Sequence, residues 1–285
     1  MQHQLNRIIV VPLLLAVALA VSARADEVSD KGREIFKKNE HAIVTVTLVQ
    51  KMAATGRSGA REAKQDITGM VVDPSGLTVL ALSSVDPSEL YRHLAEEYKT
   101  EIEVSDVKIL LEDGTEMPAE IVLRDKDLDL AFIRPKTKPA SPMAALDLSK
   151  SSRAQVLDQL VTLNRLKRAA GRAFSASVER VSAVVQKPRT FYIPDSSQTE
   201  TAMGSPAFSL DGGLVGVVVM RAVNAQGAAS VRDCMTAIIL PAEDIAKAAA
   251  QAPAEAKPDE EKKEVAAKDA KDSAAKTEVP KEPAK

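Results

Sequence analysis

The feature that most restricts the fold of this chain is a succession of short strand-like segments in two series. In the first series, residues 42–50 (AIVTVTLVQ) alternate apolar and polar side chains, and residues 67–73 and 76–82 flank a Pro-Ser-Gly turn. A second series of apolar segments runs from residue 153 to residue 241, after a linker that contains Pro and Ser. The pattern predicts an all-β protein with two sets of antiparallel strands.

The clearest hairpin signal lies at residues 107–125 (VKILLEDGTEMPAEIVLRD). Asp113 and Gly114 stand between two apolar runs, and an Asp-Gly pair tolerates the positive φ angles of tight hairpin turns. Residues 129–135 (DLAFIRP) follow as a short, nearly continuous apolar strand. This part of the chain therefore predicts three consecutive strands.

Two segments have helical rather than strand periodicity. Residues 87–102 place Leu90, Leu94 and Tyr98 on one helical face, which predicts a helical insertion. Residues 242–250 follow a proline, carry acids in the first turn and a lysine later, and predict a closing helix.

The first 25 residues have the organisation of a secretory signal peptide. Arg7 precedes an apolar run from Ile8 to Val21, and Ala23 and Ala25 have the spacing of a signal peptidase site. An uncleaved membrane anchor is the alternative, but the run is shorter than the roughly 20 residues that span a bilayer. We expect an exported protein, periplasmic or secreted, with no stable membrane anchor after cleavage.

The other end, residues 251–285, is rich in Ala, Lys, Glu, Asp and Pro and has no aromatic residue. Such a segment buries too little apolar surface to offset its ordering entropy, which predicts a disordered tail. Its lysines nearly balance its acids, so nothing indicates a nucleic-acid partner. The tail can serve as a solvated spacer or as a tether to the envelope or to a polymer, and both interpretations stay open. Residues 26–250 remain for folded structure.

Four segments in this order resemble trypsin-like serine proteases, especially the HtrA/Deg branch, over most of residues 42–247. They are GLTVLALSSVD, ILLEDGTEMPAEIVLRDKDLDLAFIRP, SSQTETAMGSPAFSLDGGLVGVVV and AIILP. The second is the most specific, because such enzymes have an Asp-Gly hairpin, a strand, an Arg-Asp pair and then the triad aspartate followed by Leu-Ala. In such enzymes a PDZ module occupies the place of the tail.

The resemblance implies a trypsin-like double six-stranded β-barrel with its active site in the cleft between barrels. Barrel one would span about residues 42–136 and barrel two about residues 153–241, with the helix over 242–250 closing the domain.

The same resemblance places the catalytic positions. Asp129 falls on the triad aspartate, whereas Ser84, or Ser83 if the register shifts by one, replaces the histidine. Met203 stands at the nucleophile, and Thr201 replaces the glycine that supplies an oxyanion-hole N–H. A serine nucleophile needs an adjacent base, and a thioether has no proton to lose, so two of three triad functions are absent.

Other residues do not restore this chemistry by their spacing. Ser205 lies two positions past the reactive turn, His41 starts the first strand, and His93 lies on the predicted helical insertion. An arrangement of Ser205, His93 and Asp129 is an alternative that no spacing favours.

The sequence contains no HExxH pattern, no paired Cys/His spacing and no P-loop, so we expect no metal and no cofactor. The single cysteine, Cys234, reads as a small buried hydrophobe. The basic cluster of Arg165, Lys167, Arg168 and Arg172 reads as a solvated loop, with an anion-attracting surface as the alternative.

These observations predict a trypsin-like serine protease homologue that is catalytically inactive, a pseudoprotease acting as a peptide- or protein-binding or structural module. The alternative is an active serine endopeptidase with relocated catalytic residues. A peptide or protein ligand in the inter-barrel cleft is the expected partner, and the sequence indicates no oligomeric state.

Overall fold

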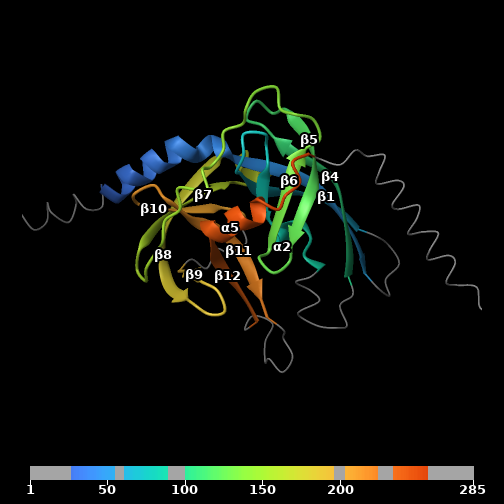
Figure 1. The fold of residues 1–285 in the computed structure, drawn as a ribbon. Helices are drawn as coiled ribbons and strands as arrows, with labels where there is room; N and C mark the ends of the chain where they lie inside the picture. The colour runs from blue at the N-terminus through green and yellow to red at the C-terminus, as the bar shows by residue number, and fades with distance from the viewer. Residues whose placement is uncertain (1–26, 55–60, 89–99, 196–202, 224–233, 256–285) are drawn as a thin grey trace, which may run out of the picture.

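A computed structural model describes residues 27–54, 61–88, 100–195, 203–223 and 234–255. Within these ranges the strands form two closed barrels of six antiparallel strands each, which lie side by side (Figure 1). The predicted all-β, double-barrel fold is therefore confirmed.

The first barrel has the strand order β1-β2-β3-β6-β5-β4. Its strands are β1 (Ile43–Ala54), β2 (Arg61–Val71), β3 (Thr78–Ala81), β4 (Thr100–Leu110), β5 (Glu116–Asp125) and β6 (Leu130–Pro135), with a short helix α2 (Leu82–Val85) after β3.

The second barrel has the order β10-β11-β12-β9-β8-β7. Its strands are β7 (Gln159–Arg165), β8 (Phe174–Val185), β9 (Phe191–Pro194), β10 (Pro206–Ser209), β11 (Leu214–Ala222) and β12 (Met235–Pro241), and the helix α5 (Ala242–Ala249) follows directly. Two single-turn 3₁₀ helices, η1 (Glu40–Ala42) and η2 (Arg168–Ala170), precede β1 and follow β7.

The predicted Asp-Gly hairpin joins β4 to β5. Leu111 N–H donates to the Thr115 carbonyl at 2.9 Å, and the Asp113 carboxylate accepts a hydrogen bond from Thr115 N–H at 2.9 Å. Gly114 has a φ of 84°, a backbone conformation that residues other than glycine rarely adopt.

The predicted helical insertion is wrong at its end. Thr100 to Ile102 belong to β4, where Thr100 pairs with Ala54 and Ile102 with Met52 of the long strand β1. Tertiary pairing with β1 thus overrides the helical periodicity of this stretch. Residues 89–99, including His93, lie outside the described residues.

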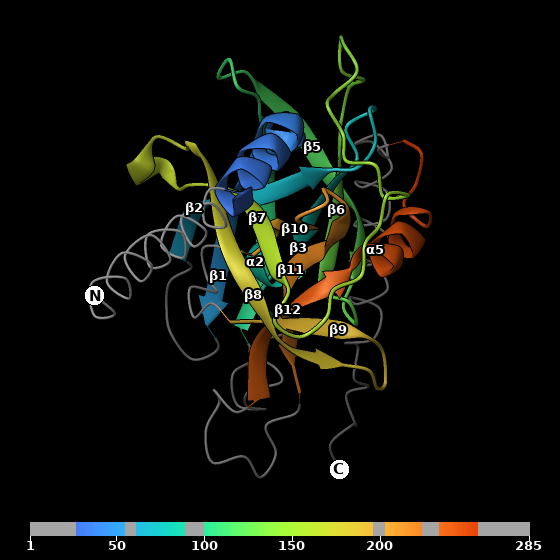
Figure 2. The same cartoon turned by 90° about the vertical axis from the view of Figure 1, so that its left-hand side faces the viewer.

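A helix over residues 27–39 was not among the predicted elements. It lies across the second barrel beside β7 (blue in Figures 1 and 2), and Gly32 approaches Val161 there. Phe36 meets Phe174 edge to face, with ring centroids 6.3 Å apart. This helix covers apolar residues that would otherwise face water.

The strands β3 and β6 are buried on both faces, which explains their nearly continuous apolar sequences. In β6, Ala131 and Ile133 pack in the interior of the first barrel, whereas Leu130 and Phe132 join a cluster that includes core residues of the second barrel. Because side chains alternate along a strand, one face fills a barrel and the other meets its neighbour. The two barrels therefore share an apolar contact surface.

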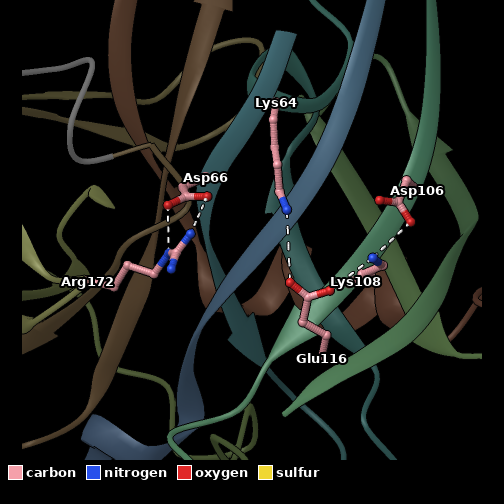
Figure 3. A network of polar contacts seen from close by, with 6 residues as sticks. All are labelled: Lys64, Asp66, Asp106, Lys108, Glu116 and Arg172. Atoms are coloured by element: carbon pink, nitrogen blue, oxygen red, sulfur yellow. Dashed lines mark hydrogen bonds and ion pairs between the residues drawn. The ribbon is translucent and has the colours of Figure 1, made fainter. Parts of the chain in front are cut away.

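Polar contacts also link the barrels. Arg172, which follows η2, reaches β2 and forms a salt bridge with Asp66 at 2.7 Å (Figure 3). Lys167 Nζ donates to the Asp66 carbonyl at 2.6 Å. In the same view, Glu116 of β5 lies between Lys64 and Lys108 on the wall of the first barrel. The basic cluster that was interpreted as a solvated loop therefore contributes two residues, Lys167 and Arg172, to the contact between the barrels.

The chain returns to the first barrel after α5, where Arg134 Nε donates to the Pro253 carbonyl at 2.6 Å. The remaining predicted tail, residues 256–285, and the predicted signal segment, residues 1–25, lie outside the described residues.

Candidate functional site

Asp129 lies at the inter-barrel boundary, in the turn that leads into β6. Its backbone has a φ of 56°, and its carbonyl accepts a hydrogen bond from Leu82 N–H at 2.9 Å. Aspartate is one of the few residues that adopt this left-handed conformation with some frequency. The backbone bond fixes the residue against the start of α2.

Three donors meet the Asp129 carboxylate. Ser83 N–H donates to Oδ1 at 2.6 Å, Ser83 Oγ donates to Oδ2 at 2.8 Å, and Met220 N–H donates to Oδ2 at 2.7 Å. The first two come from the first barrel and the third from β11 of the second. The carboxylate therefore connects the barrels through hydrogen bonds.

Burial raises the pKa of Asp129 from 3.8 to about 6, and the bonds from Met220 and Ser83 oppose that shift. Desolvation disfavours the charged form, whereas donors to the carboxylate favour it. Here the loss of water outweighs the three donors. No salt bridge among the described residues includes Asp129.

The serine beside Asp129 is Ser83, which corresponds to the second of the two registers considered for the histidine position. At Ser84, the backbone carbonyl accepts a hydrogen bond from Gln50 Nε2 at 3.1 Å. A serine hydroxyl and two backbone N–H groups therefore both contribute donors to the Asp129 carboxylate.

Met203, at the predicted nucleophile position, is only 8 % exposed. Its side chain belongs to the apolar cluster that joins the barrels, together with Met70, Ala81 and Phe132 of the first barrel and Val217 of the second. A thioether fits irregular apolar space well. This position is therefore part of the core.

The turn after Met203 is held tightly against β2. Gly204 has a φ of 82°, and a Cβ there would lie 2.4 Å from the Thr68 carbonyl oxygen. Gly204 N–H donates to the Val218 carbonyl at 2.8 Å, and Val218 N–H donates to the Ser205 carbonyl at 2.9 Å. The glycine is required here by close packing.

Ser205 is completely buried, and its hydroxyl has no hydrogen-bond partner among the described residues. No base among the described residues reaches it there, and it is closed to solvent. His41 Nδ1 donates to Glu112 Oε1 at 2.5 Å, and its ring contacts Phe174. Thr201 and His93, like the rest of 196–202 and 89–99, lie outside the described residues.

A cavity of about 90 Å³ adjoins Asp129. Its walls come from both barrels and include Ser83, Arg189, Met220 and Arg221. The sequence analysis did not identify these lining residues. It also missed the Met220 donor, because a backbone N–H carries no residue-specific signal. No group of three potential metal ligands occurs in the described part of the chain.

The fold agrees with the family comparison. The model of the trypsin-like peptidase domain matches residues 67–217, which include Asp129 and Met203. The chain belongs to this family.

Two solved structures illustrate the similarity. The chain is similar to the MamO protease domain from Magnetospirillum magneticum in its apo form, with 18 % identity over 74 % of this chain and 97 % of that one, and a TM-score of 0.48. It is also similar to an inactive mutant of Rv3671c from M. tuberculosis H37Rv, with 17 % identity over 76 % of this chain and 89 % of that one, and a TM-score of 0.45.

The comparison with curated proteins gave no match. Among the helices of the described ranges, none has the length and apolar character needed to cross a membrane.

Proposed function

We propose that this chain is an exported trypsin-like domain without peptidase chemistry, and that it acts as a peptide- or protein-binding or structural module. Its fold is that of the trypsin-like peptidase domain. The proposal concerns what the residues at the former catalytic positions do in that fold.

The observation that carries the proposal is the burial of Met203. A nucleophile must meet a substrate carbonyl, and its proton must pass to an adjacent base. Met203 lies in the apolar contact between the barrels and offers neither a proton nor access. Ser83, which donates to Asp129, offers no basic nitrogen at the histidine position.

The ligand we propose is a peptide segment in the cleft between the barrels. The cavity beside Asp129 supports this idea, because its walls combine apolar residues such as Leu128 with the cations Arg189 and Arg221 and the acid Asp86. Such a mixture can hold an apolar side chain and orient polar groups around it.

Labelling with a fluorophosphonate probe, with trypsin as the positive control, tests the loss of chemistry. We expect no covalent labelling of the folded protein and no cleavage of denatured casein. Labelling of Ser205, or casein cleavage that Asp129→Asn abolishes, would instead establish the endopeptidase with relocated residues.

Export is tested separately by the intact mass of protein secreted from its host. Cleavage after Ala25 would leave Asp26 as the first residue. Retention of residues 1–25 would contradict the signal-peptide interpretation without affecting the proposal on catalysis.

A further inference from the structure

A second pocket, of about 320 Å³, lies at the end of the first barrel and shares no lining residue with the cavity beside Asp129. Its apolar lining comes from the start of β1, the end of β4 and the linker between barrels. These residues are Ile43, Val44, Leu110, Leu111, Met143 and Ala144. Its polar lining consists of His41, Glu112, Asp113 and Arg165.

Arg165 is the polar residue whose charge is least compensated. Its guanidinium carbon lies 3.8 Å from the centre of the Phe174 ring, and Nε donates weakly to Thr45 Oγ1 at 3.4 Å. No carboxylate of the described residues lies within salt-bridge distance of it. Burial lowers the pKa of Arg165, as expected for a partly desolvated cation.

The other charged groups nearby each have a partner. Glu112 contacts the His41 imidazole at 2.5 Å, and this contact raises the pKa of His41. Asp113 accepts from Thr115 N–H within the hairpin, and Arg172 is bound to Asp66. Glu112 attracts the Arg165 charge and Arg172 repels it, so Arg172 offsets part of the compensation that Glu112 supplies.

We propose that this pocket binds a small amphipathic carboxylate, with its apolar body against the Ile43, Leu110 and Met143 side chains and its carboxylate on the Arg165 guanidinium. A guanidinium can bind a carboxylate through two parallel hydrogen bonds, which would compensate its partial burial. The volume is near the lower end of the roughly 300–1,000 Å³ typical of ligand pockets, which favours a short chain over a long one.

The first experiment is calorimetric titration of the full chain with sodium octanoate. We expect saturable binding, and at least about tenfold weaker binding of octanol and octylamine, which lack the negative charge. Arg165→Met should weaken octanoate binding at least about tenfold, whereas Arg168→Met, at an exposed arginine of η2, should leave it unchanged.

A second variant separates binding from folding, because Arg165 also packs on Phe174. Ala144 is exposed and lines the pocket, so Ala144→Trp should block the pocket while leaving Arg165 and the barrel strands intact. We expect this variant to keep its melting temperature and to lose octanoate binding.

The source of the carboxylate is distinguished with a short peptide ending in Val-Leu, tested with a free and with an amidated C-terminus. Tighter binding of the free-acid peptide than of octanoate would indicate a peptide terminus, and the reverse a free small acid. Absence of saturable octanoate binding to the wild type would overturn the proposal and leave Arg165 with a packing role. Binding to Arg165→Met and Ala144→Trp that is as tight as binding to the wild type would overturn it as well.

Discussion

Asp129 and Met203 occupy two corners of the candidate site, and the structure surrounds them in opposite ways. Asp129 remains a polar group and is satisfied by Ser83 and by the Met220 backbone of the other barrel. Met203 is apolar and packs in the cluster shared by the barrels. Each position is thus stable in its own surroundings.

The difference shows that a polar and an apolar side chain can both be stable at the boundary between the barrels. A buried polar group is costly only when it lacks hydrogen bonds, and a buried apolar group stabilises by filling space. Asp129 meets the first condition and Met203 the second. The interface between barrels can therefore be maintained by either solution.

The largest expected effect is at the apolar corner. Met203→Ser should lower the free energy of unfolding by about 2–5 kcal/mol, because it removes buried apolar volume and places a hydroxyl in the core. Urea denaturation measures the free energy of unfolding. Met235→Ser, at a partly exposed methionine, is the matched control and should lower that free energy by a smaller amount. Equal stability of Met203→Ser and wild type would contradict the packing role of Met203.

At the polar corner, the stability should depend on pH. The pKa of Asp129 is about 6 in the fold against 3.8 unfolded, so the native state holds an extra proton between these values. The stabilisation from this proton is complete below about pH 4 and is lost as the pH rises through 6.

Asp129→Asn removes this titration, so the free-energy difference between wild type and variant should be larger at pH 4 than at pH 7, by up to about 3 kcal/mol. At pH 7 the variant should lose about 1 kcal/mol, since its amide leaves one backbone N–H without an acceptor. Parallel denaturation at both pH values tests this, and a difference that is larger at pH 7 would have the wrong sign.

A smaller effect is expected at the serine. Ser83→Ala removes the hydroxyl donor but keeps the backbone N–H bond to Asp129, and should cost about 1 kcal/mol at pH 7. It should also raise the pKa of Asp129 further. Ser84→Ala is the matched control and should change stability by less than about 0.5 kcal/mol. Equal effects of the two changes would argue against the Ser83 contact.

The smallest expected effect is on hydrolysis. Ser83→His combined with Met203→Ser should cleave denatured casein no faster than wild type, because Thr201 still resists the backbone geometry that the oxyanion position needs. Thr201→Gly would be required as a third change. Casein cleavage by the double variant would contradict this prediction, because it would show that the residues at positions 83 and 203 alone prevent hydrolysis.

The strand pattern and the Asp-Gly hairpin were predictable because their signals are local. Asp129 was singled out by the resemblance to trypsin-like proteases, through the order of turn, strand and Arg-Asp pair that precedes it. The end of the helical insertion was not, because pairing of Thr100 with Ala54 joins residues far apart in the chain. The helix over residues 27–39 was missed, and its burial depends on contacts with β7 and β8.

The sequence by itself determined the strands, the hairpin turn and the residue types at the candidate site, because periodicity, turn chemistry and side-chain identity are properties of short segments. Only the tertiary structure decided that Ser83 rather than Ser84 contacts Asp129 and that Met220 supplies its third hydrogen bond. It also decided that Met203 joins the contact between the barrels. The physical reason is that burial and hydrogen-bond partners arise from segments far apart in the chain, 46 residues for Ser83 and Asp129 and 91 residues for Asp129 and Met220.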